Sequence, residues 1–209
     1  MRFEFPLPHP PFDNSPRARS ILRAAREVFV RRGYAGFSIR AVGRAAGASM
    51  GAVQNFFPTK DRLLAAMLEY VANEYEAVYQ RLFRKLPVNG EARLYAVIDY
   101  LVDDLWREDT RHFFVGLWAL GVHDARAREL INQMYAHHRR NIAMFIGGAR
   151  PGFSDAQCYE TALLIGALIE GLILFTAPRS PHRLSRVSLR RSVREAVARL
   201  IAAPAQPPT

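Results

Sequence analysis

Residues 46–64, with the sequence AGASMGAVQNFFPTKDRLL, decide the fold of this chain. The stretch carries few charges, and a polar pair, Gln54 and Asn55, lies near its middle. Gly47 occupies a position where a left-handed turn is favourable, and Pro58 prevents a helix from continuing past it. We therefore expect one short, weakly charged helix between this turn and this proline, with a polar exposed face.

A second helix is expected immediately before the turn. Ser38 is a good N-cap, and Ile39 and Val42 follow it at helical spacing. Gly43 lies inside this helix, where glycine costs about 1 kcal/mol relative to alanine. A residue without a Cβ is worth that cost if the next helix crosses close by, with Val53 pointing back into the core. The two helices and the turn between them predict a helix-turn-helix.

An arginine-rich helix is expected upstream, from Arg17 to Gly33, which ends it. Apolar residues recur on one face at helical spacing, namely Ile21, Ala25, Val28 and Phe29. Several arginines lie largely off that face: Arg19, Arg23, Arg26 and Arg31. We interpret them as a solvated face rather than as specific contacts.

The remainder of the chain shows helical rather than strand-like patterns. Thr59 caps a long helix that extends to about Arg84, and LPVNG at 86–90 breaks the chain. Further helices are expected at about 91–107, 110–122, 125–148, 154–177 and 187–202. The predicted fold is all-α, with a three-helix helix-turn-helix head and a larger helical body, about nine helices altogether.

The charge is concentrated in the N-terminal part of the chain. Of a net charge of +10 over 209 residues, residues 1–60 contribute +7, from ten lysines and arginines against three acidic residues. A positive field of this kind favours an anionic partner: nucleic acid, acidic lipid or a charged ligand. Cys158 is the single cysteine, which excludes an internal disulfide and fits a cytoplasmic protein. The proline-rich N-terminus lacks the apolar run of a signal peptide.

One apolar run, TALLIGALIEGLILFTA at 161–177, requires a membrane span to be considered. It is at the short limit for a span, and Glu170 lies inside it. We therefore favour a central helix buried between other helices or between two subunits, and expect no membrane association.

Residues 17–64 resemble the DNA-binding region of TetR-family transcriptional regulators. The matching segments are ILRAAREVFVRRGYAGFSIRAVGRAAGASMGAV at 21–53 and FFPTKDRLL at 56–64. In the body, FVGLWALGVHD at 114–124 and IEGLIL at 169–174 are similar to a loosely defined subgroup of these regulators.

The resemblance implies a cytoplasmic homodimer that binds double-stranded DNA at a pseudo-palindromic operator. Its two heads reach successive major grooves about 34 Å apart. The body binds a small-molecule effector, and the last two helices of each subunit pair into a four-helix bundle. We expect a repressor that the effector releases. The expected domains are a flexible extension at 1–16, a DNA-binding domain at 17–58, a ligand-binding and dimerisation domain at 59–203, and a loose tail at 204–209.

The last helix carries a stripe suited to subunit pairing, formed by Leu189, Val193, Val197 and Leu200. Together with the apolar run at 161–177, it predicts a two-helix dimerisation face on each subunit and a stable dimer in solution.

The candidate DNA-binding residues follow from position in the matching segments. They are Ser38, Arg40, Ser49, Met50, Ala52, Gln54, Asn55 and Lys60. Asparagine and glutamine pair with adenine edges, and apolar groups contact the thymine methyl. Lys60 is expected to meet a phosphate at the start of a helix. Gln54 stands where the family usually has tyrosine, and it reads either a base or a phosphate. Phe56 stands where histidine or tyrosine is frequent.

The candidate ligand-binding residues are aromatic or lone polar side chains of the body. They are Tyr100, Asp103, Trp106, Phe114, Trp118, His123, Met134 and Glu170. Glu170 is the best candidate, because burying an acid without a partner costs free energy. The alternative role for Glu170 is a hydrogen bond between helices. Core packing is the alternative for the aromatics. Aromatics beside acids also suit a cationic ligand.

Two other classes of protein are compatible with a basic helical chain. An enzyme would need a catalytic pattern, and His123, Asp124, His137 and His138 match no common zinc spacing. The sequence also lacks a nucleophile elbow, a P-loop and a dinucleotide fingerprint, so we expect no catalytic residue, no metal and no cofactor. The alternative to a specific regulator is a non-specific DNA-binding or chromosome-organising protein, which needs the same basic head but no effector.

Overall fold

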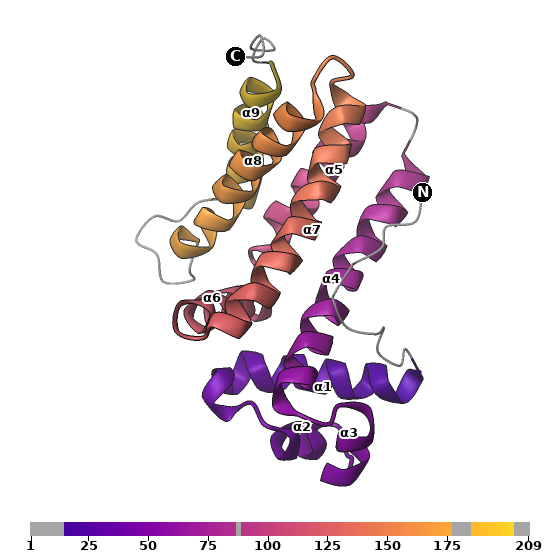
Figure 1. Cartoon of the computed structure of the whole chain (residues 1–209). Helices are drawn as coiled ribbons and strands as arrows, with labels where there is room; N and C mark the ends of the chain where they lie inside the picture. Colours follow the sequence, from indigo (N-terminus) through magenta and orange to yellow (C-terminus); the bar gives the residue numbers. More distant parts are fainter. Residues whose placement is uncertain (1–14, 87–88, 177–184, 203–209) are drawn as a thin grey trace. The chain divides into compact units, whose positions relative to one another are not determined.

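The computed structural model describes residues 15–86, 89–176 and 185–202, and these residues form nine helices (Figure 1). The helices are α1 (Pro16–Gly36), α2 (Ile39–Ala45), α3 (Met50–Phe56), α4 (Lys60–Lys85), α5 (Gly90–Asp104), α6 (Glu108–His123), α7 (Ala125–Ala149), α8 (Asp155–Phe175) and α9 (Arg186–Ala202). The all-α prediction is confirmed. Most of the expected N-terminal extension, and the expected tail, lie outside the described residues.

The chain packs as two compact units. The first comprises residues 1–77 and 112–135, and the second comprises 78–111 and 136–209. Both units therefore contain parts of α4, α6 and α7. The domain boundary expected after residue 58 stays a prediction.

In the first unit, α2, α3 and α4 begin where the sequence indicates. Ser38 and Ser49 each accept a hydrogen bond from the backbone N–H three residues later, at 3.2 and 3.1 Å. The Thr59 hydroxyl accepts one from Arg62 N at 3.2 Å in the same way. These are N-cap contacts, and each satisfies a backbone donor that the first helical turn leaves unpaired.

The upstream helix is longer than expected. It continues to Gly36, although Gly33 interrupts its helical geometry with φ 61° and ψ −174°. Glycine tolerates this conformation because it has no Cβ. Gly33 therefore kinks α1 instead of ending it.

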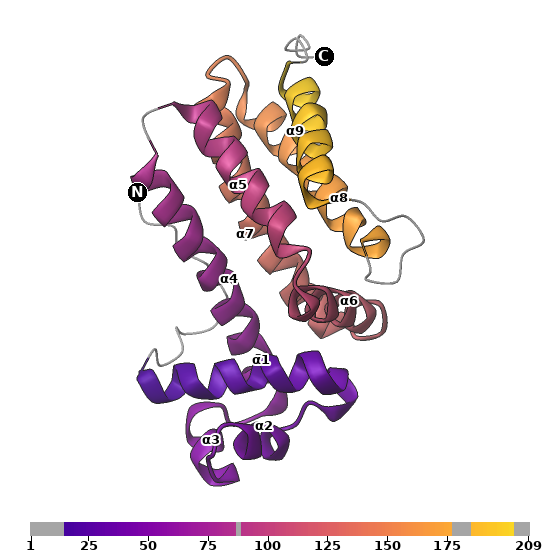
Figure 2. The same cartoon turned by 180° about the vertical axis from the view of Figure 1, so that it is seen from behind.

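The close crossing of α2 and α3 is confirmed. A Cβ on Gly43 would lie 2.9 Å from the carbonyl oxygen of Ala48, and Val53 from α3 is fully buried beside it. Gly47 turns the chain with φ 60°. Figures 1 and 2 show α2 and α3 together on one side of α1. Because Gly43 has no side chain, α3 can pack closely against α2 at this position.

A single apolar core holds the first unit together. Phe29 of α1 makes edge-to-face contacts with Phe37 and Phe113, with ring centroids 5.9 and 5.6 Å apart. Leu63 and Met67 of α4 are fully buried in the same cluster. The start of α4 is thereby packed into the core that α1, α2 and α3 form.

In the second unit, α5 and α7 approach backbone to backbone. A Cβ on Gly90, at the start of α5, would lie 1.8 Å from the carbonyl oxygen of Gly148, near the end of α7. Asn89 caps α5 because its side-chain oxygen accepts hydrogen bonds from the backbone N–H groups of Glu91 and Ala92, at 3.0 and 3.2 Å. Glycine is therefore required at position 90 by space and not by backbone conformation.

The helix α8 is buried on one face only. Of the described helices, it alone is long and apolar enough to cross a membrane, and a third of its apolar window is buried in the chain. Leu164, Leu174 and Phe175 are 53%, 64% and 66% exposed. Complete burial between helices of one chain was expected as one alternative, and it is wrong. Burial between two subunits stays a prediction.

The apolar stripe of α9 is used within the chain. Leu189, Val193 and Val197 are buried, and the stripe ends at buried Ile201 instead of half-buried Leu200. Figures 1 and 2 show α9 beside α8. The residues expected to pair with another subunit thus pack inside this one.

Candidate functional site

The helix α3 presents a mixed polar and apolar face to solvent. Gln54 and Asn55 are exposed, Met50 is 46% exposed, and Ala52 is half-buried. Val53 on the opposite face anchors the helix in the core. The side chains predicted to read bases are therefore brought together on one accessible surface.

Ser38 and Ser49 have a structural role: their hydroxyl oxygens accept the N-cap hydrogen bonds of α2 and α3. Their contact with DNA stays a prediction. A serine hydroxyl keeps one donor when its oxygen accepts a bond, so capping and a phosphate contact are compatible.

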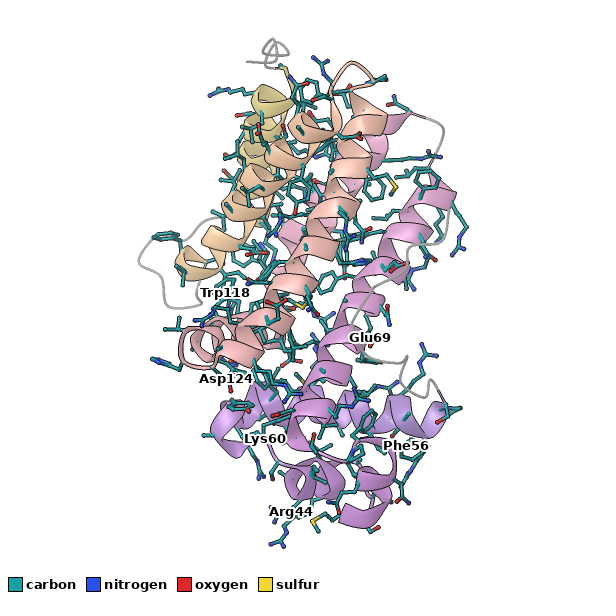
Figure 3. All side chains as sticks on the ribbon, viewed as in Figure 1. Arg44, Phe56, Lys60, Glu69, Trp118 and Asp124 are labelled. Carbon is teal, nitrogen blue, oxygen red and sulfur yellow. The ribbon has the colours of Figure 1, made fainter. Side chains whose placement is uncertain are left out.

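Two arginines lie exposed on α2. Arg40 was predicted to contact DNA, and Arg44 lies one turn further along the same helix. Figure 3 shows Arg44 extending from the head beside α3. Arg44 was not predicted to contact DNA, although its spacing of four residues from Arg40 places both on one helix face.

Lys60 lies against the end of α1. Its ammonium nitrogen donates to the carbonyl oxygen of Tyr34 at 3.0 Å and lies 3.6 Å from the centroid of the Tyr34 ring. Burial lowers the Lys60 pKa from its usual value, while the charges of Asp61 and Asp124 oppose that shift. Figure 3 labels Lys60 and Asp124 in the same region of the first unit. The predicted phosphate contact of Lys60 is not tested by this arrangement.

The solvated-face interpretation of the α1 arginines is wrong for Arg26. Its guanidinium is half-buried, lies 4.0 Å from the Glu74 carboxylate and is 5.9 Å from the centroid of the Phe113 ring. Arg19, Arg23 and Arg31 are exposed. One arginine of the four therefore ties α1 to α4, because its position on the helix turns it toward the core.

The predicted ligand-binding residues fall in both units. Phe114, Trp118, His123 and Met134 belong to the first unit, and Tyr100, Asp103, Trp106 and Glu170 belong to the second.

In the first unit, three aromatic side chains form a small cluster. The Trp118 indole N–H donates to the Tyr135 hydroxyl at 2.7 Å, and the Phe114 ring lies 6.3 Å from the Trp118 ring. Met134 is buried in the core, and His123 is exposed at the end of α6. Of the four predicted residues in this unit, Phe114 and Trp118 are thus brought together.

In the second unit, a buried aromatic cluster surrounds Tyr79. Its ring lies 6.5 Å from the Tyr100 ring and 6.0 Å from the Phe145 ring, and its hydroxyl lies 3.1 Å from Nδ1 of His138. Burial raises the Tyr79 pKa, and nearby negative charge, including that of Glu170, adds to the effect. The Tyr79 cluster includes Tyr100, and Glu170 is close enough for its charge to act on Tyr79. Tyr79 and Phe145 were not predicted as site residues, because their helical spacing is typical of ordinary core residues.

Asp103 and Trp106 lie elsewhere, at the contact between α5 and α9. Arg190 donates to both carboxylate oxygens of Asp103, with one distance of 2.6 Å. The Arg186 guanidinium lies 5.3 Å from the centroid of the Trp106 ring. Both side chains therefore help to join α9 to α5, and their role in ligand binding stays a prediction.

A helix-turn-helix head followed by a helical body is the architecture of one class of bacterial DNA-binding regulators. Residues 21–67 match the family described as bacterial regulatory proteins, tetR family, and residues 87–202 match the BetI-type transcriptional repressor, C-terminal. The chain belongs to the TetR family of transcriptional regulators, with a BetI-type C-terminal region.

Individual relatives agree with this assignment. The HTH-type transcriptional regulator BetI of Escherichia coli is 26% identical over 163 residues, which cover 77% of this chain and 82% of BetI. A transcriptional regulator from Pseudomonas aeruginosa PAO1 shares the fold with a TM-score of 0.72 at 18% identity, over 89% of this chain and 90% of that one. A regulator from Saccharomonospora viridis, solved in complex with choline, has a TM-score of 0.63 at 23% identity, over 90% and 96%. The protein is thus a DNA-binding transcriptional regulator, in a family of regulators rather than enzymes.

Proposed function

We propose that the protein is a cytoplasmic, ligand-responsive repressor that binds a pseudo-palindromic operator as a homodimer. The observation that carries the proposal is the exposed face of α3, where Gln54 and Asn55 are available to base edges. The exposed arginines of α2, Arg40 and Arg44, supply positive charge beside it. Short polar groups read bases while arginines hold phosphates, which explains a weakly charged helix beside basic ones.

Effector binding releases the DNA by shifting a population. A ligand changes the equilibrium only by its differential affinity for the DNA-competent state and the other state. The start of α4 is packed in the core of the head through Leu63 and Met67. A change in α4 on effector binding would therefore be transmitted to the placement of α3.

The first test is operator selection. Sequencing the DNA fragments that the purified protein selects from a genomic library identifies an operator, and Arg40→Ala and Asn55→Ala should each weaken binding to it by about 1–3 kcal/mol and relax sequence choice. Lys60→Ala should weaken binding to all DNA sequences by a similar amount. Gel-shift titrations measure each loss. Exposed Arg81 of α4 provides a charge-matched control, Arg81→Ala.

Competition with unrelated DNA separates the two candidate functions. A specific regulator keeps its operator complex against excess unrelated duplex, whereas a non-specific DNA-binding protein loses it. Loss of the complex under these conditions would favour the chromosome-organising alternative.

The exposed apolar face of α8 supports a homodimer. Leu174 and Phe175 stay largely exposed in the single chain, and burial of one such side chain stabilises an interface by about 1.5–3 kcal/mol. Leu174→Glu should therefore weaken the dimer about a hundredfold or more, because it also places an unpaired charge in an apolar contact. Sedimentation of the Leu174→Glu variant should show a monomer at micromolar concentration. Val122 of α6 is about as exposed as Leu174 and provides the control. Val122→Glu should leave the dimer intact.

The Tyr79 cluster supports a small organic cation as the effector. Aromatic faces attract a cation through their quadrupole, and the carboxylate of Glu170 adds negative charge near Tyr79. The choline complex of the Saccharomonospora viridis regulator has the same fold. Choline is therefore the probe of choice.

Calorimetric titration with choline should show binding that Tyr100→Leu and Glu170→Gln each weaken about tenfold or more, which corresponds to about 1.4 kcal/mol. Trp118→Leu in the first unit serves as the comparison. If Trp118→Leu abolishes binding while Tyr100→Leu has no effect, the effector lies in the first unit and the Tyr79 cluster is core packing.

A further inference from the structure

Tyr34 contacts the Lys60 ammonium in two independent ways. Its backbone carbonyl accepts a hydrogen bond at 3.0 Å, and the centroid of its ring lies 3.6 Å from the same nitrogen. The two residues are 26 positions apart in the chain, so only the fold of the head brings them together. Both contacts fix one cationic group at the start of α4.

Tyr34 is itself held in place. Gly33 turns the backbone immediately before it, with φ 61° and ψ −174°. The Tyr34 ring stacks on the fully buried Phe37 ring at 6.5 Å with an interplanar angle of 21°. The backbone N–H of Phe37 also donates to the Tyr34 carbonyl at 3.2 Å. Tyr34 therefore gives Lys60 a rigid support and not a mobile neighbour.

The charged groups of the protein leave the Lys60 ammonium able to bind an external anion. Asp61 and Asp124 are the acids whose charges act on Lys60, and Asp61 pairs with Arg126 at 3.1 Å. A lysine ammonium has three N–H donors, and the carbonyl of Tyr34 takes one of them. Lys60 is only half-buried, so the remaining donors are within reach of an anion from solvent.

We propose that Tyr34 is a positioning residue for DNA binding, which holds Lys60 so that its remaining N–H donors meet a phosphate of the DNA backbone. The inference rests on the proposed function, and specifically on the phosphate contact of Lys60. A free lysine side chain loses up to about 2 kcal/mol of rotamer entropy when it is immobilised. Tyr34 removes much of that loss from the binding step, because the lysine is ordered before DNA arrives.

The test is the salt dependence of binding to a fluorescent duplex of mixed sequence, measured by anisotropy. Each phosphate contact adds about 0.9 to the slope of log affinity against log salt concentration. Lys60→Ala should lower the slope by about one for each head that binds. Tyr34→Leu, which removes the ring, should lower the affinity at each salt concentration by up to about thirtyfold and leave the slope near its original value, because Lys60 still meets the phosphate but is immobilised only on binding. Tyr34→Phe keeps the ring and the carbonyl and should retain the original affinity and slope.

The outcomes separate the inference from the function on which it rests. If Lys60→Ala lowers the slope and Tyr34→Leu leaves the affinity unchanged, Tyr34 has no positioning role, and the proposed function stands. If Lys60→Ala leaves the slope unchanged, Lys60 makes no phosphate contact, and the inference is wrong while DNA binding persists. If the original protein shows no affinity for the duplex at low salt, the proposed function is wrong as well.

A second measurement covers the case in which Tyr34→Leu does not fold. In the original protein, the ring current of Tyr34 should shift the Lys60 side-chain methylene protons upfield in a carbon–proton correlation spectrum. This upfield shift should persist when the duplex is added in excess, because the lysine stays on the ring while it binds. Collapse of the shift on DNA binding would show that Lys60 leaves Tyr34 to reach DNA, and would overturn the proposal.

Discussion

Replacing Gly90 with alanine is expected to destabilise the protein by about 3 kcal/mol or more. The new Cβ would lie 1.8 Å from the carbonyl oxygen of Gly148 and 2.2 Å from its carbonyl carbon. Both atoms belong to the backbone, so no change of side-chain rotamer relieves the overlap. The ends of α5 and α7 would have to separate, and the buried contacts of the second unit would loosen with them.

Gly148→Ala is the matched control from the other side of the same contact. Its Cβ would lie 4.0 Å from the Gly90 Cα, an ordinary van der Waals separation. Because alanine favours a helix over glycine by about 1 kcal/mol, this variant should be as stable as the original protein or slightly more stable. Urea unfolding followed by circular dichroism measures both free energies. Equal stabilities for the two variants would contradict the backbone-to-backbone approach of α5 and α7.

Acid is expected to destabilise the protein through His137 and His138. Burial lowers the pKa of each to about 4, and positive charge from Arg140 and Arg139 respectively contributes. In the unfolded chain a histidine titrates at about 6.5. Between these values the unfolded state binds more protons than the folded state, so folding stability falls as the pH is lowered through this window.

The expected loss between pH 7.5 and pH 4.5 is about 2–4 kcal/mol for the two histidines together, allowing for solvent relaxation. A variant with both histidines replaced by glutamine should lack this part of the pH dependence. The measured quantity is the difference in unfolding free energy between the variant and the original protein at each pH. This difference should grow in favour of the variant as the pH falls below about 6.5.

Glu69 changes the pH dependence of folding stability in the opposite direction. Its contribution therefore has to be measured separately from that of the histidines. Burial raises its pKa to about 7, so the folded state takes up a proton before the unfolded state does. Acidification from pH 7.5 to pH 4.5 therefore stabilises the protein through Glu69. Glu69→Gln removes this contribution. His123→Gln, at an exposed position, is the control for the histidine substitutions. If the variant with both histidines replaced shows the same pH dependence of the unfolding free energy as the original protein, His137 and His138 are accessible to protons in the folded state.

The helices of the head were predictable because their signals are local. A serine cap and the N–H that it accepts lie three residues apart, and the φ of Gly47 depends on that residue alone. The close crossing at Gly43 was predictable for a related reason, since an interior helical glycine is unfavourable unless space requires it. The same local signals carried the family resemblance, and with it the candidate DNA-binding residues.

The candidate site in the body could be predicted only in part. Tyr100 and Glu170 were selected from the sequence. The Tyr100 ring contacts Tyr79, which was not selected, and the charge of Glu170 acts on Tyr79. Asp103 was selected as a lone polar residue, but its partner Arg190 lies 87 residues away. No periodic pattern reveals such a pair, because the two helices that carry it meet only after folding.

The amino-acid sequence by itself determined the helix starts, the turn at Gly47 and the concentration of positive charge in the first 60 residues, because each depends on neighbouring residues or on composition. Only the tertiary structure decided which charged groups became partners: Lys60 with Tyr34, and Asp103 with Arg190. The reason is physical. A helix is closed by hydrogen bonds four residues apart, whereas the partner of a side chain depends on how helices distant in the chain cross.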